Sequence, residues 1–149
     1  MFKKTVTLFE ITFDIFFVYD RVVGSVGLNI AGLRTFRIKR FLQIHISQVG
    51  ISSITLSELI YGAVKSSKPD QNKLALAQFA APLEIIPYGD EAALQYGNLR
   101  SHLEKRCTPI GSLDMLIGAH ALSMNCILVT NNEKEFIRVP NLKVENWAQ

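Results

Sequence analysis

Residues 49–67, VGISSITLSELIYGAVKSS, decide the fold class of this chain. The first six form a short apolar run that predicts a buried strand. The residues that follow carry apolar side chains at helical spacing, at Leu56, Leu59, Ile60 and Val64. A strand therefore leads directly into a helix. Because parallel strands need a crossover connection, which is usually helical, this pattern is typical of an α/β fold.

The same alternation continues along the chain. Apolar runs predict strands at residues 11–19, 83–87 and 126–130, and helical spacing predicts helices at residues 73–79, 90–104 and 112–124. Strands separated by helices of about a dozen residues predict a mainly parallel sheet with helices on both faces. The 149 residues, 48% of them hydrophobic, are enough for one core, so we expect a single domain over residues 1–149.

Composition bears on the compartment and on the class of partner. The formal net charge of +3 and the pI near 9.0 fit a polyanionic partner such as nucleic acid, although the excess is small. Cys107 and Cys126 lack C-x-x-C spacing, so we expect two free thiols in a reducing cytoplasm. Glu10 and Asp14 interrupt the apolar start of the chain, and no apolar run reaches the roughly 18 to 20 residues that cross a bilayer. We therefore expect no membrane span.

Acidic and amide side chains follow the predicted strands. In open α/β sheets, ligands bind beyond the carboxyl ends of the strands, so these side chains are expected to gather at one edge of the sheet. Carboxylates in a small volume repel one another unless a cation neutralises them, and oxygen ligands select Mg²⁺ or Mn²⁺. The histidines, His45, His102 and His120, are poor zinc candidates. The side chains in question are Asp20, Glu58, Asp114, Asn131, Asn132 and Glu135.

Several of these residues also have a structural explanation. Thr55 and Glu58 match a capping box, in which Thr55 caps the helix and Glu58 bonds back to its amide. Asp114 lies in the first turn of a helix, where the helix dipole favours an acid. Asn131 fits an N-cap, and Thr130 either ends its strand or bonds a phosphate or a carboxylate.

Three stretches in a fixed order resemble a known family. They are ISSITLSELIYGAVKS, then LEIIPY with YGNLRSHLEKRCTPIGSLDMLIGAHAL, then LVTNNEKEFIRVPNLKVENW. Over residues 49–147 the chain resembles the PIN-domain ribonucleases, and more closely the VapC-type toxins of prokaryotic toxin–antitoxin pairs. The order and spacing of three motifs make this resemblance far more specific than any single motif. Residues 1–40 do not resemble the family.

The resemblance implies a PIN-like three-layer α/β/α domain that cuts RNA with Mg²⁺, with Mn²⁺ as the other candidate. It also implies a cognate antitoxin partner and a homodimer. By position, the helix acid of the family falls on Glu58 and its metal-binding aspartate on Asp114. The T-N-x-x-x-(D/E)-F element falls on Thr130, Asn131, Glu135 and Phe136.

The chain departs from the family pattern at its first acidic motif. The usual L-D-T-N tetrapeptide is absent, and Asp20 in FFVYDRVV is the expected substitute, with Asp14 as the other candidate. Our hypothesis is that Asp20, Glu58 and Asp114 bind one or two Mg²⁺ ions, while Asn131 and Glu135 orient the metal-bound water or the ligands. The ion would polarise a phosphodiester and activate a water for in-line attack.

Two other functions remain open at this level. The chain could be a catalytically impaired PIN-like domain that only binds antitoxin or RNA, or a Mg²⁺-dependent phosphatase acting on small esters. Leu59, Ile60 and Tyr61 are expected in the core and not on a partner surface. Basic side chains that could contact the RNA backbone are Lys65, Lys68, Arg100, Lys105 and Arg106.

Overall fold

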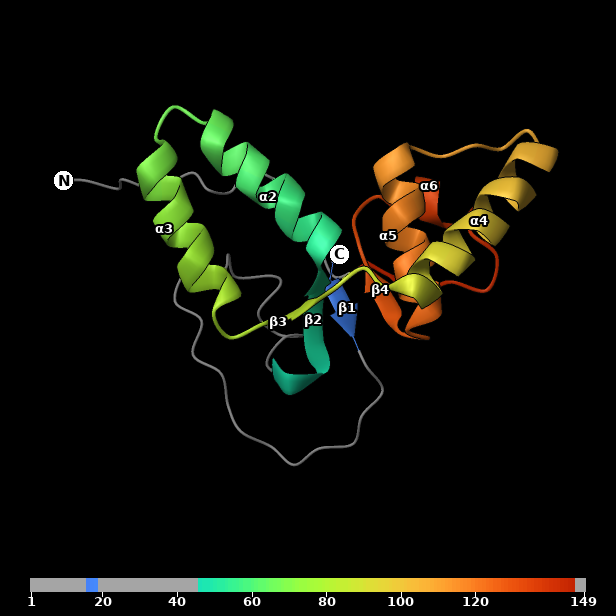
Figure 1. Cartoon of the computed structure of the whole chain (residues 1–149), viewed down its shortest axis with the longest axis horizontal. Coiled ribbons are helices and arrows are strands. Elements are labelled where there is room, and N and C mark those ends of the chain that lie inside the picture. The colour runs from blue at the N-terminus through green and yellow to red at the C-terminus, as the bar shows by residue number, and fades with distance from the viewer. Residues whose placement is uncertain (1–15, 19–45, 147–149) are drawn as a thin grey trace.

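The computed structural model describes residues 16–18 and 46–146 of the chain. In this part of the chain one five-stranded sheet has the order β3-β2-β1-β4-β5, with helices on both faces (Figure 1). The strands are β1 (Phe16–Val18), β2 (Val49–Ser52), β3 (Glu84–Ile86), β4 (Ile127–Val129) and β5 (Lys143–Glu145). The helices are η2 (Ile46–Gln48), α2 (Ser53–Lys65), α3 (Pro69–Ala80), α4 (Asp90–Lys105), α5 (Ser112–Ser123) and α6 (Glu133–Phe136).

The expected alternation of strands and helices is confirmed from residue 49 onward, and the α/β class with it. Of the strand expected at residues 11–19, residues 16–18 are described and form β1. Asp14 and Asp20 lie outside the described residues. In the described part of the chain, no helix is long and apolar enough to cross a membrane.

The core is divided by the sheet into two apolar clusters, which makes the fold three-layered. Because successive side chains of a strand point to opposite faces, Val49 and Ile51 of β2 pack with α2 and α3, while Phe17 and Leu128 pack with α4, α5 and α6. Figure 1 shows α2 and α3 on one side of the sheet and α4 to α6 on the other. The sequence pattern therefore specifies both faces of each central strand.

The direction of β1 differs from the expected mainly parallel sheet. The pairs β2–β3 and β4–β5 are parallel, whereas β1 runs antiparallel to both β2 and β4. Val18 therefore lies beside Val49 and Ile127, the first residues of β2 and β4, and Phe16 lies beside Val129, the last residue of β4. The carboxyl end of β1 is thus at the edge opposite the carboxyl ends of its neighbours. A strand this short buries Phe17 in either direction, so the hydrophobic pattern does not determine which way it runs.

Gly50 is required by close packing at the centre of the sheet. Phe17 lies opposite Gly50 in the register, and a Cβ at position 50 would come within 2.7 Å of Ile86 Cδ1 and 3.0 Å of the backbone oxygen of Glu84. The side chains of Phe17 and Ile86, which belong to the same cluster, occupy this face of the sheet. Glycine allows the three strands to meet there.

Helix α2 begins earlier than the capping-box prediction required. Its N-cap is Ser52, whose hydroxyl accepts a hydrogen bond from the backbone N–H of Ile54 at 3.1 Å. Thr55 lies inside the first turn, where its buried hydroxyl has no hydrogen-bond partner among the residues that the structure describes. The assignment of Thr55 as the cap is therefore wrong, because a serine at the strand end already satisfies the first turn of the helix. Glu58 is not a capping residue.

The burial of side chains on the outer face of α2 also differs from the prediction. Leu59 is buried as predicted, but Ile60 and Tyr61 are exposed, and Val64 one turn further along is exposed as well. The prediction that all of Leu59, Ile60 and Tyr61 belong to the core is thus wrong for the last two. These three exposed side chains form an apolar strip on α2.

Candidate active site

Asp114 lies at the N-terminal end of α5, behind the loop of residues 109–111. Gly111 occupies the N-cap position, and Asp114 is the acid of the first turn. Its carboxylate turns back toward this loop, so that a Cβ at position 111 would lie 3.3 Å from Asp114 Oδ2. The Pro-Ile-Gly sequence thus starts the helix and leaves room for the carboxylate.

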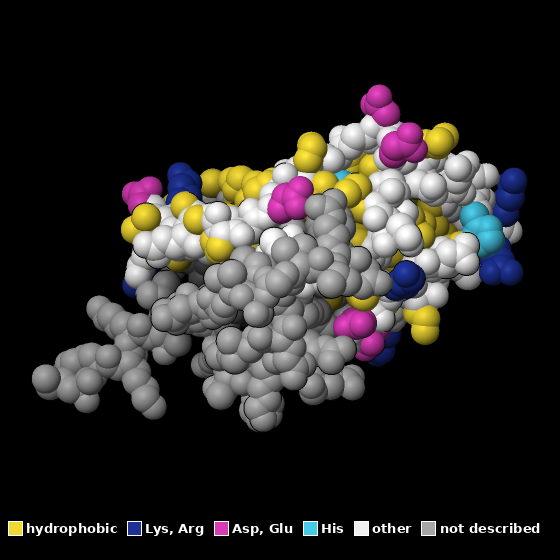
Figure 2. Space-filling view, turned by 90° about the horizontal axis from the view of Figure 1, so that it is seen from below, with side chains coloured by type: hydrophobic (Ala, Val, Ile, Leu, Met, Phe, Trp, Pro, Cys, Tyr) yellow, Lys and Arg dark blue, Asp and Glu magenta, His cyan; other side chains and the backbone are white. Residues whose placement is uncertain are grey.

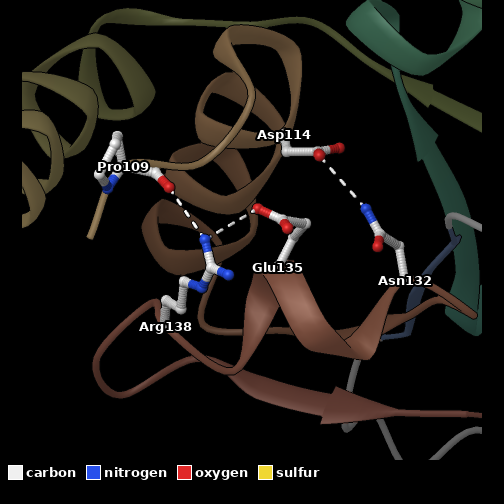
Figure 3. A network of polar contacts seen from close by, with 5 residues as sticks. All are labelled: Pro109, Asp114, Asn132, Glu135 and Arg138. Atoms are coloured by element: carbon white, nitrogen blue, oxygen red, sulfur yellow. Dashed lines mark hydrogen bonds and ion pairs between the residues drawn. The ribbon is translucent and has the colours of Figure 1, made fainter.

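The end of β4 brings an amide group to this carboxylate. Thr130 is buried, its backbone N–H donates to the carbonyl of Glu145 at 2.9 Å, and its hydroxyl accepts from the backbone N–H of Asn132 at 3.0 Å. This fixes the turn after β4, so that Asn132 Nδ2 donates to Asp114 Oδ2 at 3.3 Å (Figure 3). In this structure Thr130 ends the strand and shapes the turn.

Glu135 brings a second carboxylate close to the first. It lies on α6, and Figure 3 shows it between Asp114 and Arg138. Burial raises the pKa of Asp114, and the negative charge of Glu135 raises it further. This upward shift occurs although Asp114 lies at the N-terminus of α5, where the helix dipole favours a negative charge. The two acids therefore form a region of incompletely balanced negative charge.

Arg138 borders this acidic pair. Its NH1 group donates to the carbonyl of Pro109 at 3.0 Å and to Glu135 Oε2 at 3.4 Å (Figure 3). Both side chains of the ion pair are partly exposed, with 42% of Arg138 and 30% of Glu135 accessible. Such an exposed pair neutralises Glu135 only in part, because solvent screens it.

The structure brings together only some of the residues that the sequence nominated. Asp114 and Glu135 meet, but the amide on Asp114 belongs to Asn132 and not to the nominated Asn131. Glu58 is exposed on α2, and within the described part of the chain its side chain makes no hydrogen bond or ion pair. The sequence placed Asn132 among the polar residues at the strand ends without giving it a role, and Arg138 was not nominated at all. The sequence features that could have indicated these two residues are the Asn131–Asn132 doublet and the position of an arginine three residues after Glu135.

The donor set fits a hard divalent cation. Asp114, Glu135 and Asn132 present carboxylate and amide oxygens, and Mg²⁺ is typically held by one or two carboxylates while it keeps several waters. Among the described residues there is no group of three or more His, Cys, Asp or Glu that could hold a metal ion. Oxygen donors of this kind suit Mg²⁺ or Mn²⁺ better than zinc.

His120 lies apart from these acids, in the core. It is 1% exposed, and its Nδ1 is 2.8 Å from Ser52 Oγ. The ring also donates to the carbonyl of Pro87, which leaves Nδ1 to accept the hydroxyl proton of Ser52. The rings of Phe17 and Tyr88 pack edge-on against it. His120 is thus a neutral link between β2, the segment before α4, and α5.

The state of His120 makes the stability of the fold depend on pH. Burial lowers its pKa below 6.5, and the bond to Pro87 offsets this only in part. The unfolded chain therefore binds the proton more readily, so the contribution of His120 to stability is complete above about pH 6.5 and falls as the pH drops below that value. We expect wild type to lose more unfolding free energy than His120→Gln between pH 7.5 and 5.5. Equal losses in urea titrations at the two pH values would contradict this.

Both cysteines are free thiols, as expected. Cys107 is exposed, and Cys126 is buried at the start of β4. Burial raises the pKa of Cys126 to about 12, so it stays protonated and unreactive. Neither is part of the acidic pair.

Comparison with known proteins identifies relatives of this chain. The PIN domain matches residues 30–142, which extends the similarity toward the N-terminus beyond the residues that first suggested it. The tRNA(fMet)-specific endonuclease VapC of Salmonella typhimurium is 41% identical over 111 residues, which cover 74% of this chain and 84% of that protein. The ribonuclease VapC2 of Rickettsia felis is 50% identical over 99 residues, with 66% and 74% covered.

A solved structure gives the same result in three dimensions. The crystal structure of DNA-bound VapBC from Salmonella typhimurium contains a chain that superimposes with a TM-score of 0.73 at 39% identity. The aligned part covers 77% of this chain and 87% of that one. The shared fold thus extends over most of both chains.

Proposed function

The chain belongs to the PIN-domain family, and from that premise we propose that it is a metal-dependent endoribonuclease, the toxin of a toxin–antitoxin pair. The observation that carries the proposal is the facing of Asp114 and Glu135, whose mutual repulsion a divalent cation would relieve. Relatives named as ribonucleases support the substrate class.

The cation we propose is Mg²⁺, with Mn²⁺ as a substitute. Asp114 and Glu135 would hold it, and Asn132 would keep the carboxylate of Asp114 oriented through its hydrogen bond. When bound, the ion neutralises charge on a phosphodiester and lowers the pKa of water, so that hydrolysis proceeds near neutral pH. Asn131 remains a proposed orienting residue, and Glu58 a proposed acid that acts when RNA or partner is bound.

The direction of β1 bears on which residue is the third carboxylate of the proposed site. The end of β1 beside Val129, at the carboxyl edge of β4, is Phe16, and Asp14 precedes Phe16 by two positions in the sequence. Asp20 follows Val18, which is at the other edge. Strand direction therefore favours Asp14 as the third carboxylate, although the sequence alone favoured Asp20.

We expect Asp14→Asn to weaken Mn²⁺ binding and RNA cleavage about tenfold, and Asp20→Asn to change both less than twofold, because Asp14 precedes the end of β1 that lies beside the carboxyl end of β4, whereas Asp20 follows the other end of β1. Calorimetric titration of each variant with Mn²⁺ and a cleavage time course measure the two effects. Loss of binding in Asp20→Asn alone would restore the assignment made from the sequence.

The partners we propose are RNA and an antitoxin. The apolar strip on α2, formed by Ile60, Tyr61 and Val64, is the kind of exposed patch that marks a protein contact, and the similar Salmonella structure is a VapBC complex. For RNA, Figure 2 shows Lys and Arg side chains with a histidine at the end of the molecule formed by α4, whose last turn carries His102 and Lys105. Contacts of these side chains with the RNA backbone would add affinity without selecting a particular RNA sequence. A homodimer stays a prediction.

The experiment that tests the function is cleavage of RNA by the purified chain. Because the Salmonella relative is named for tRNA(fMet), that tRNA is the first substrate to use. Cleavage in Mg²⁺ that EDTA abolishes and Mn²⁺ restores is the expected result. Binding of RNA or antitoxin with no cleavage would instead identify a binding domain. Hydrolysis of a simple phosphomonoester with RNA left intact would identify a phosphatase.

A further inference from the structure

Arg138 joins the two segments that carry the acidic pair. It follows α6, which bears Glu135, and its NH1 group contacts the loop five residues before Asp114, at the carbonyl of Pro109. The same NH1 group donates to Glu135 Oε2. In Figure 3 the guanidinium bridges the loop before α5 and the helix α6, on the side of Glu135 away from Asn132.

The geometry separates two possible roles for this arginine. As a counter-charge it would mainly neutralise Glu135, and as a brace it would mainly fix where Glu135 lies. The bond to the neutral carbonyl of Pro109, at 3.0 Å, is shorter than the 3.4 Å contact to the carboxylate. Solvent screens the carboxylate contact, because 42% of the Arg138 side chain is exposed. The contacts therefore fit a role in fixing the position of Glu135 better than a role in neutralising its charge.

We propose that Arg138 is a positioning residue, which anchors Glu135 to the loop before α5 so that Glu135 and Asp114 face a single divalent cation. This inference rests on the proposed function, because it assumes that the two acids share an ion. Asn132 holds Asp114 from the other side through its 3.3 Å hydrogen bond, so each acid has its own polar support. Supports of this kind orient metal ligands in proteins generally.

The two roles predict opposite effects on metal binding. A guanidinium beside the site repels a cation, so if Arg138 acted only through its charge, removing it would tighten Mn²⁺ binding. If it positions Glu135, removing it lets that side chain move away, and binding weakens. Loss of an outer support typically costs about 10–100-fold in metal affinity.

The test is Mn²⁺ binding by isothermal titration calorimetry, without RNA. Arg138→Met keeps the aliphatic stem but loses the charge and the donors, and we expect its dissociation constant to rise about tenfold. Arg138→Lys keeps the charge and a donor and should recover part of the affinity, so the expected order is wild type, then lysine, then methionine. The matched control is Arg100→Met, because Arg100 makes a comparable exposed ion pair with Glu104 on α4 at 2.8 Å.

The outcomes distinguish this inference from the proposed function. If Arg138→Met binds Mn²⁺ as well as or better than Arg100→Met, the positioning role is refuted while the function stands. If wild type binds no Mn²⁺ and cuts no RNA, the function itself fails. Thermal unfolding of each variant confirms that the chain is folded, and Arg138→Lys carries the test if the methionine variant is not. Wild-type affinity in that lysine variant would then refute the role.

Discussion

Asp114→Asn is expected to lower the rate of RNA cleavage on the order of a hundredfold or more, because it removes a proposed metal ligand itself and not only a support, whose loss costs about 10–100-fold. Asparagine has nearly the same shape as aspartate, so the hydrogen-bonded turn around residue 132 can persist. What is lost is the negative charge that we propose binds the cation. Single-turnover cleavage at saturating RNA measures the effect without a contribution from substrate binding.

The same variant should be at least as stable as wild type, which separates a functional acid from a structural one. Burial and Glu135 raise the pKa of Asp114, so its charged form is less favourable in the folded chain than in the unfolded one. At neutral pH that charge destabilises the fold, and neutral asparagine removes the cost. An acid kept only to start a helix would show the opposite sign. Thermal unfolding at pH 7.5 without metal measures this difference.

Asp70→Asn is the matched control for this experiment. Asp70 is also a first-turn acid, on α3, which lies on the other face of the sheet from α5 (Figure 1). Its substitution should leave cleavage unchanged and lower the melting temperature slightly, because the helix dipole favours the acid. If Asp114→Asn behaved like Asp70→Asn, with cleavage intact, Asp114 would be a helix acid and the proposed site would be wrong.

The sequence predicted most of the elements because their hydrophobic patterns leave little choice. In β2, Val49 and Ile51 face one helix layer while Ser52 faces the other, and a shift of one residue would bury the wrong set. Asp114 was nominated for a related reason, since the loop between α4 and α5 starts a helix whose first turn meets the segment that follows β4. Periodicity therefore determines the layers and the edge of the sheet at which these polar side chains gather.

What the sequence did not determine is which of two neighbouring polar residues makes a given hydrogen bond. The N-cap of α2 is Ser52 and not the predicted Thr55, because the hydroxyl of Ser52 at the end of β2 accepts a hydrogen bond from the N–H of Ile54. The amide on Asp114 came from Asn132 because the hydroxyl of Thr130 sets the turn. In both cases neighbouring residues of similar chemistry compete, and hydrogen bonds of about 1 kcal/mol decide between them.

His120→Ala is expected to destabilise the fold by about 3–5 kcal/mol, because it combines a cavity with two broken hydrogen bonds. The ring is 1% exposed and packs against Phe17 and Tyr88. Its loss leaves the hydroxyl of Ser52 and the carbonyl of Pro87 without this partner. Urea unfolding at pH 7.5 measures the change.

His102→Ala is the control, because His102 lies in the last turn of α4 and no hydrogen bond or ion pair joins its side chain to another described residue. It should change stability by no more than about 0.5 kcal/mol. The hydroxyl of Ser52 both caps α2 and bonds the histidine of α5. A small effect of His120→Ala would mean that the packing of α5 alone keeps Asp114 at the sheet edge. A large effect would mean that this buried link joins the helix of Glu58 to the helix of Asp114, and therefore that the geometry of the acidic site depends on a residue that never touches it.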